Sequence, residues 1–234
     1  IDHDAARASM ERTLRWAGRA RRRFDALSTG AAPDVVPTTP GQAQFGIVQG
    51  STYKDLRDES LDGTVALGFE GYAIGGLSVG EPADQMYEIV SHTAGRLPAG
   101  QPRYLMGTGT PVDLLESVSR GVDLFDCVLP TRNARNGQLF TRRGPISIKN
   151  ARYAEDFGPL DPDCACPTCR AHTRAYLRHL FVSGEMTAST LNTLHNLHFY
   201  LDTMREIRKA IEFGIFDKFK RTFLETYSRR QPVP

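Results

Sequence analysis

A repeated unit of strand, glycine-rich loop and helix is predicted over the first half of the chain. The apolar runs are short and nearly continuous, so we expect strands that are buried on both faces, as in a parallel sheet. Such a repeat is typical of a doubly wound sheet or of a (β/α)8 barrel. The predicted strands are 45–50, 71–77, 103–107 and 121–126, and the predicted helices between them are 53–67, 82–96 and 111–120.

Helices are also predicted at both ends of the chain. Apolar residues recur at helical spacing within 5–27, and residues 28–44 follow as a proline-rich linker. Further helices are predicted at 170–182, 187–214 and 216–228. One apolar stripe in the second of these is expected in a core or at a subunit interface, and it consists of Leu191, Leu194, Leu197 and Leu201.

Residues with useful chemistry follow the predicted strands at one end. Gln49, Gly76, Met106 and Asp126 each stand at the carboxyl end of a strand. Because parallel strands run in one direction, we expect these residues around a single rim. Barrels and doubly wound sheets carry their active sites at that rim.

The segment 124–130 is apolar except for one carboxylate, that of Asp126, and a polar stretch with Arg132 and Arg135 follows it. A buried carboxylate is costly to ionise, and arginines suit phosphate groups. These residues favour a carboxylate nucleophile or base beside an anion-binding loop. An equally open alternative is that Asp126 caps the strand and the arginines form a solvated turn.

Composition changes this picture only slightly. The 234 residues carry a formal net charge of +2, and an apolar fraction of 40% is enough for a sizeable core. Arginines crowd the first 23 residues and the segment after Asp126, which favours a polyanionic partner or, equally, solvated helix faces. No apolar run approaches the ~20 residues that span a bilayer, and no signal peptide pattern opens the sequence. We therefore expect a cytoplasmic protein with no membrane association.

Three of the four cysteines lie within six residues, as Cys164-x-Cys166-x2-Cys169. Thiolates at this spacing can converge on one tetrahedral zinc ion, whereas a disulfide would leave one thiol over. We expect a structural Zn²⁺ with four protein ligands, and the residues leave the fourth ligand open among His172, His179, His195 and His198. The remaining thiol, that of Cys127, is expected to act as a small core hydrophobe.

Several ordered motifs together resemble the bacterial tRNA-guanine transglycosylases. The resemblance runs from about Met10 to the last predicted helix. Its motifs are FGIVQG at 45–50, GYAIGGL at 71–77, YLMG at 104–107, FDCVLPTRNARNG at 125–137 and the cysteine spacing at 164–169.

The resemblance implies a (β/α)8 TIM barrel with a zinc-binding subdomain and C-terminal helices. It implies a glycosyltransferase that exchanges guanine at wobble position 34 of tRNAs with GUN anticodons for the queuosine precursor preQ1. These tRNAs carry aspartate, asparagine, histidine and tyrosine. The bacterial form is indicated by the segment 78–81, where Val79 disfavours the bulkier base queuine. The family works as a homodimer.

The resemblance also assigns roles to residues. Asp126 matches the nucleophile, which forms a covalent ribosyl-enzyme as in a retaining glycosidase with a base in place of water. The residues that would bind the flat purine are Gln49, Gly76, Leu77, Tyr104 and Met106. Those that would bind the anticodon region are Gly107, Thr108, Gly109, Thr110, Pro111, Val112, Asp113, Thr131, Arg132, Asn133, Ala134 and Arg135. The implied zinc ligands are Cys164, Cys166, Cys169 and His195.

The sequence departs from the family in one respect, because only four of its eight βα units are present. The unmatched part carries the family's general acid/base aspartate. We therefore expect residues 1–143 to be the C-terminal half of the barrel, and 144–234 to be the zinc-binding subdomain with the C-terminal helices. A half-barrel alone is expected to be poorly stable and nearly inactive, since its sheet edges stay open.

Two other functions stay open. One is a non-catalytic tRNA-binding accessory chain or an inactive fragment of such an enzyme, against which the intact Asp126 speaks. The other is a different base exchange, such as the archaeal reaction in the D-arm, against which the cysteine spacing and the motif at 125–137 speak.

Overall fold

The computed structural model describes residues 1–30 and 41–228, which form two compact units. The first unit contains residues 1–109 and 116–127, and the second contains residues 110–115 and those from 128 onward. The expected division between residues 143 and 144 stays a prediction. Most of the expected linker, residues 31–40, lies outside the described residues.

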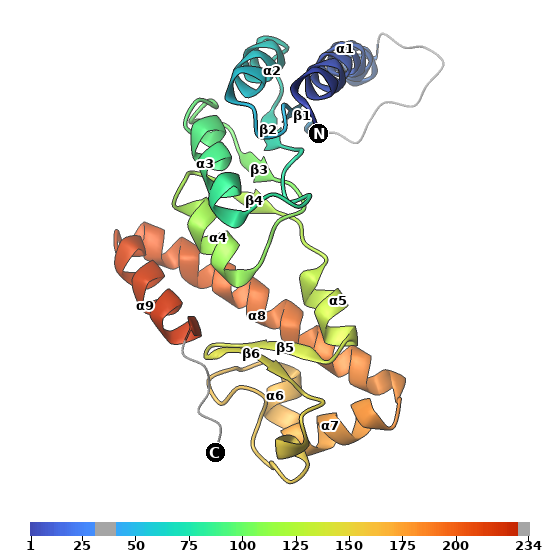
Figure 1. Ribbon diagram of the computed structural model, residues 1–234, viewed down its shortest axis with the longest axis vertical. Coiled ribbons are helices and arrows are strands. Elements are labelled where there is room, and N and C mark those ends of the chain that lie inside the picture. Colours follow the sequence, from blue (N-terminus) through green and yellow to red (C-terminus); the bar gives the residue numbers. More distant parts are fainter. Residues whose placement is uncertain (31–40, 229–234) are drawn as a thin grey trace. The chain divides into compact units, whose positions relative to one another are not determined.

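Four parallel strands form the sheet of the first unit, in the order β1-β2-β3-β4 (Figure 1). The predicted alternation of strand and helix is confirmed, although each strand is shorter than predicted. In β1, β2 and β3 the last predicted residues belong to the following loop, and β4 also lacks the first three predicted residues, 121–123. The strands are β1 (Phe45–Val48), β2 (Gly71–Ile74), β3 (Arg103–Leu105) and β4 (Leu124–Phe125). The helices are α1 (His3–Ser28), α2 (Lys54–Ala66), α3 (Ala83–Ala94) and α4 (Pro111–Val118).

The strand order decides between the two architectures that the sequence leaves open. Each strand pairs with the next one along the chain, in register from Phe45 opposite Gly71 through to Leu105 opposite Phe125. A doubly wound sheet reverses its order at the centre, whereas consecutive strands of a (β/α)8 barrel do not. The described sheet therefore has the order of consecutive barrel strands.

The core of the first unit joins the sheet to its helices. Val48, Ile74 and Leu105 are fully buried on three neighbouring strands and belong to one cluster with Ile89 of α3. The fourth strand differs from the expectation of two buried faces, since Leu124 is 45% exposed. β4 has only two residues and pairs on one side only, so little of its surface is covered.

A fully buried arginine holds the carboxyl ends of β1 and β2. Arg57 of α2 donates hydrogen bonds to three backbone carbonyl oxygens, those of Ser51 at 2.7 Å, Val48 at 3.0 Å and Gly76 at 3.4 Å. Burial lowers the pKa of Arg57 to about 10, and the charge of Glu81 opposes this shift. The guanidinium therefore stays charged at neutral pH and fixes two loops by their backbones.

Replacement of this arginine should destabilise the first unit. Arg57→Met keeps an apolar stem but removes three hydrogen bonds to backbone carbonyl groups, each worth about 1 kcal/mol. We expect urea denaturation to show a loss of about 3 kcal/mol in the free energy of unfolding. The control is Arg96→Met, just beyond the end of α3. The exposed side chain of Arg96 pairs with Asp58 and Asp62, so this variant should cost under about 1 kcal/mol. Equal losses in both variants would contradict the role given to Arg57.

The second unit is built around a hairpin and a long helix (Figure 1). The strands β5 (Gln138–Thr141) and β6 (Gly144–Ser147) pair antiparallel. Leu139, Ile148, Leu160 and Leu177 are fully buried in one cluster with the cysteines. The helices are α5 (Leu129–Arg135), η1 (Ala151–Tyr153), α6 (Pro167–Ala171), α7 (Arg174–Val182), α8 (Met186–Glu212) and α9 (Phe216–Ser228).

Two local expectations for this region are wrong. The polar stretch 131–135 is not a loop but most of helix α5, because Pro130 suits a first helical turn and no helix breaker intervenes before Gly137. Cys127 lies beyond β4 and is only partly buried, so it is not a core residue.

The apolar stripe of α8 is mainly at the surface. Leu191 packs partly against the cluster around the cysteines. Leu194, Leu197 and Leu201 are 45%, 39% and 64% exposed. Of the two expected locations, a core or a subunit interface, the core therefore applies only to Leu191. None of the helices in the described ranges is long and apolar enough to cross a bilayer.

Candidate functional site

The carboxyl ends of the four strands meet at one edge of the first unit's sheet. Gln49 follows β1, Gly76 follows β2, Met106 follows β3 and Asp126 follows β4, each within two residues of the strand end. The backbone links these ends, because Gly75 N donates to Val48 O and Met106 N donates to Ile74 O. The predicted common rim is therefore present, and the order along it is that of the strands.

Asp126 is exposed and is held by two donors at one of its oxygens. The hydroxyl of Tyr104 donates to Oδ1 at 2.6 Å, and the amide of Gly107 donates to the same atom at 2.7 Å. No hydrogen bond to Oδ2 is found within the described ranges. The carboxylate is thus oriented through Oδ1 and leaves Oδ2 available to an electrophile.

These hydrogen bonds also set the protonation of the pair. The Tyr104 hydroxyl, followed by the Gly107 amide, holds the pKa of Asp126 below its usual range. The same bond raises the pKa of Tyr104 to about 12, since removing its proton would place two negative charges together. At neutral pH, Asp126 is an ionised carboxylate and Tyr104 is a neutral phenol.

The variant Tyr104→Phe tests this pairing. It removes the larger of the two contributions, so the pKa of Asp126 should rise toward the ordinary aspartate value. The measurement is a pH titration of the ¹³C carboxyl signal of Asp126, with assignment by Asp126→Asn. Tyr53→Phe is the matched control, because its hydroxyl donates to Ile1 O and not to Asp126. An unshifted titration in Tyr104→Phe would show that the phenol does not stabilise the carboxylate.

The side chain of Gln49 lies directly over two glycines. A Cβ built on Gly75 would come within 2.9 Å of Gln49 Nε2, and one built on Gly76 would come within 2.5 Å of Gln49 Oε1. Gly76 also has a φ of +66°, which disfavours any other residue there. The amide of Gln49 therefore sits flat against the backbone at the end of β2.

A turn that follows this backbone is closed by Glu81. Its carboxylate accepts from the amides of Ser78 and Val79, the latter at 3.0 Å, and Ser78 has a φ of +59°. Partial burial opposes ionisation of Glu81, but these amides and the Arg57 charge outweigh it and hold the pKa below the usual range. The sequence alone assigns no role to Glu81 or Arg57. Arg57 lies seven residues beyond the motif at 45–50 and Glu81 four beyond the motif at 71–77, so neither belongs to a local pattern.

The residues predicted to bind tRNA fall in both units. Gly107, Thr108 and Gly109 belong to the first unit. In the second unit, the amide of Thr110 donates to Asp113 Oδ2 at 3.0 Å and the amide of Asp113 donates to Thr110 Oγ1 at 3.1 Å. This reciprocal pair caps α4, so these two side chains have a structural role of their own.

The basic residues of α5 lie in the second unit as well. Arg132 and Arg135 are exposed, and no ion pair of either is found among the described residues. Asn133 is partly buried and Ala134 is buried, so only one face of α5 can meet a ligand. An exposed pair of unpaired arginines on one short helix is suited to phosphate.

The second unit contains a group of four potential metal ligands. Sγ of Cys164, Cys166 and Cys169 lie 3.8, 3.5 and 3.3 Å from Nδ1 of His195. All four atoms lie within 4.8 Å of one another, and His195 is fully buried. A tetrahedral ion with Zn–S and Zn–N bonds of about 2.3 and 2.0 Å would separate sulfur and nitrogen by roughly 3.5 Å. The four residues therefore fit one structural zinc ion.

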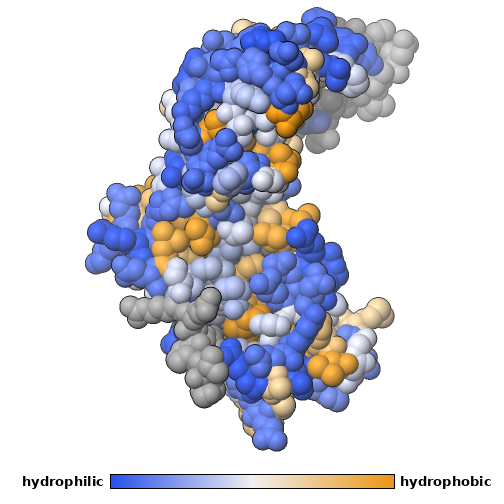
Figure 2. Space-filling view, viewed as in Figure 1, coloured by the Kyte–Doolittle hydropathy of each residue, from blue (hydrophilic) through white to orange (hydrophobic). Residues whose placement is uncertain are grey.

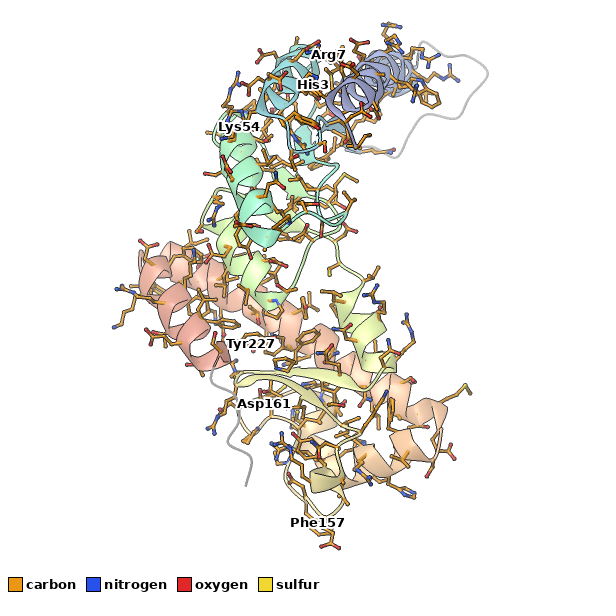
Figure 3. The ribbon with its side chains drawn as sticks, in the orientation of Figure 1. His3, Arg7, Lys54, Phe157, Asp161 and Tyr227 are labelled. Carbon is orange, nitrogen blue, oxygen red and sulfur yellow. The ribbon has the colours of Figure 1, made fainter. Side chains whose placement is uncertain are left out.

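Neighbouring groups orient these ligands. His195 Nε2 donates to Phe140 O at 2.8 Å, which directs the lone pair of Nδ1 toward the thiolates. Asp161, labelled in Figure 3, is 3% exposed and accepts from the amides of Arg142 and Asp163. This carboxylate ties the segment before Cys164 to the end of β5. The expected zinc site is confirmed, with His195 as the fourth ligand.

Loss of one ligand should release the metal. We expect the purified chain to contain one zinc ion per molecule by elemental mass spectrometry, and Cys166→Ser to contain close to none. The variant should also lose the free energy of folding that the metal supplies to the small cluster. Cys127→Ser is the control and should retain its zinc, since Cys127 lies outside the group. Full zinc in Cys166→Ser would refute the assignment.

Two observations define the class of protein. A barrel-type parallel sheet carries an ionised carboxylate at its carboxyl edge, and a closed Cys3His group follows it along the chain, as in an enzyme with a structural metal subdomain. The sequence matches the protein family TGT, described as queuine tRNA-ribosyltransferase, over residues 1–229. The chain belongs to this family of glycosyltransferases that act on tRNA. Its four βα units are consistent with part of the family's (β/α)8 barrel.

Proposed function

We propose that this chain exchanges guanine at wobble position 34 of tRNAs with GUN anticodons for preQ1, with Asp126 as the nucleophile. The observation that carries the proposal is the state of Asp126. It is an ionised, exposed carboxylate at the rim of a parallel sheet, fixed through one oxygen and open at the other. Membership of the family supplies the substrate class, which is tRNA.

The reaction would proceed in two displacements at one carbon. Oδ2 of Asp126 attacks C1′ of the ribose, and guanine leaves with the electrons of the glycosidic bond. The incoming base then attacks C1′ through a ring nitrogen from the face that guanine left, and the carboxylate departs unchanged. The proton that the incoming base loses to solvent balances the one that the departing guanine takes up. Two displacements on opposite faces retain the configuration at C1′, as in a retaining glycosidase.

The rim beside Asp126 offers groups for a flat purine. The amide of Gln49 presents a donor and an acceptor, and the backbone of Gly76 and Leu77 presents further ones. Tyr104 and Met106 are partly buried and would flank the faces of the base. An aromatic ring and a polarizable thioether suit contact with a π system.

The anticodon strand would meet two sets of residues. The loop 107–110 and the first turn of α4 would lie along one side of the strand, where the exposed residues Gly107 and Thr110 can contact it. Arg132 and Arg135 of α5 supply exposed guanidinium groups for phosphates or flanking bases. We further propose that the protein works as a homodimer in the cytoplasm, where a reducing environment keeps the zinc thiolates free of disulfides.

Asp126→Asn provides the decisive test. The chain is incubated with a GUN anticodon stem-loop and labelled preQ1, and both covalent adduct and incorporated label are measured. We expect wild type to form a detectable adduct on denaturing gels, although the half-barrel is expected to exchange the base slowly, and the variant to lose the adduct by roughly a thousandfold or more. Asp62→Asn on exposed α2 is the matched control and should behave as wild type.

Each of the other possible outcomes would favour a different role for Asp126 or for the chain. An adduct that persists in Asp126→Asn would overturn the role of this carboxylate. Stem-loop binding by wild type with no adduct would identify an accessory RNA-binding chain. Entry of a different base, or entry at a position other than the wobble nucleotide, would identify another base exchange.

A further inference from the structure

Helix α1 has two faces with different uses of arginine. The packed face carries Ala6 and Met10, which are buried against Leu56 of α2. Its arginines are committed to acidic partners: Arg7 contacts Glu59 at 2.6 Å, and Arg21 contacts Glu70 at 2.8 Å. Figure 3 shows Arg7 on the same part of α1 as His3, which contacts Asp55 of α2. These ion pairs attach α1 to the unit.

The opposite face is cationic and largely unpaired. At about 100° per residue, its exposed arginines and Trp16 fall within an arc of roughly 120°. Within the described residues, the only ion pair of this face joins Arg15 to Glu11 at the long distance of 4.0 Å. We call this group the arginine face, and it consists of Arg12, Arg15, Trp16, Arg19, Arg22 and Arg23.

A hollow on α1 brings three of these guanidinium groups together. It is lined by Leu14, Arg15, Gly18, Arg19 and Arg22 and has a volume of about 520 Å³. Gly18 has no side chain to fill this hollow, and a Cβ at its position would lie 3.7 Å from Arg22 Nη1. Arg15, Arg19 and Arg22 are spaced at i, i+4 and i+7 around this hollow, so their guanidinium groups can contact the oxygens of one or two phosphates.

An aromatic ring stands beside this hollow. Trp16 is 63% exposed, and the guanidinium of Arg19 lies 5.1 Å from the centre of its ring. Large exposed tryptophans are uncommon on surfaces with no partner, and a stack of arginine on tryptophan can pack against a base or ribose. Figure 2 shows that the visible part of the surface over α1 and α2 is mostly hydrophilic.

We propose that the arginine face of α1 is a sequence-independent contact for the phosphate backbone of RNA, and of tRNA in particular. Charge complementarity decides the partner, because the face offers five guanidinium groups and no lysine. The proposal goes beyond the proposed function, since this contact lies on a helix and not at the carboxyl edge of the sheet. It requires neither Asp126 nor a GUN anticodon.

The chain contains one tryptophan, so its fluorescence reports on this face alone. Titration of the full chain with tRNA should change Trp16 fluorescence, and added salt should reverse the change. Two tRNAs, with and without a GUN anticodon, should act alike, and Asp126→Asn should respond as wild type does. An unchanged signal at saturating tRNA would overturn the proposal, whatever happens to base exchange.

Substitution of the three arginines around the hollow gives a quantitative test. Arg15→Gln, Arg19→Gln and Arg22→Gln together should weaken tRNA binding at least tenfold in fluorescence anisotropy. The slope of log K against log salt should fall in magnitude by about 2 to 3, since about three phosphate contacts are lost. Circular dichroism should show unchanged helix content, because all three side chains are exposed.

The matched control removes three cations that are already paired. Lys54→Gln, Arg96→Gln and Arg205→Gln together cause the same change in net charge, but their partners are Glu88, Asp58 and Asp202. For this variant, the slope of log K for tRNA binding against log salt should equal that of wild type. Equal effects of both triple variants would overturn a localised contact, and a Trp16 response to polyglutamate but not to tRNA would point to an acidic protein instead.

Discussion

Parallel pairing of four consecutive strands is the constraint on which the candidate site depends. Each strand contributes two to four residues to the sheet, so the pairing alone places Gln49, Gly76, Met106 and Asp126 on one edge. None of these residues is close to another in the sequence. A slip of register by one residue would carry the side chain of Gln49 away from the glycines that accommodate it.

The rim is held from inside as well as by the sheet. Arg57 reaches the carbonyl groups at the ends of β1 and β2, and its charge also favours the ionised form of Glu81, which closes the next turn. A buried cation that contacts only backbone oxygens is costly in isolation. Here it joins three segments that would otherwise end in loops of high glycine content. The result is a backbone surface at the ends of β1 and β2 that one buried side chain holds together.

The sequence predicts the repeat, the rim and the metal ligands because each follows from local pattern. Strand ends and glycines mark the rim, and the spacing of Cys164, Cys166 and Cys169 marks the zinc group. The polar side chains of residues 131–135 favour a loop, but Pro130 suits the first turn of a helix and Gly137, with a positive φ, follows its end, so these residues are helical. The network of Arg57 could not be predicted, since it joins residues 48, 51 and 76 only after folding. Likewise, the fourth zinc ligand needed α8 to carry His195, rather than its neighbours, to the thiolates.

The two donors on Asp126 bear on the chemistry in a way that the motif alone does not reveal. On the proposed reaction, the carboxylate must attack C1′ and later leave it. Donors that hold its pKa low weaken it as a nucleophile and improve it as a leaving group. In an exchange between two purine-like bases, the second step resembles the reverse of the first. The same stabilisation therefore acts on the carboxylate when it attacks and when it departs. Tyr104 and Gly107 supply that stabilisation through Oδ1 while Oδ2 makes and breaks the bond.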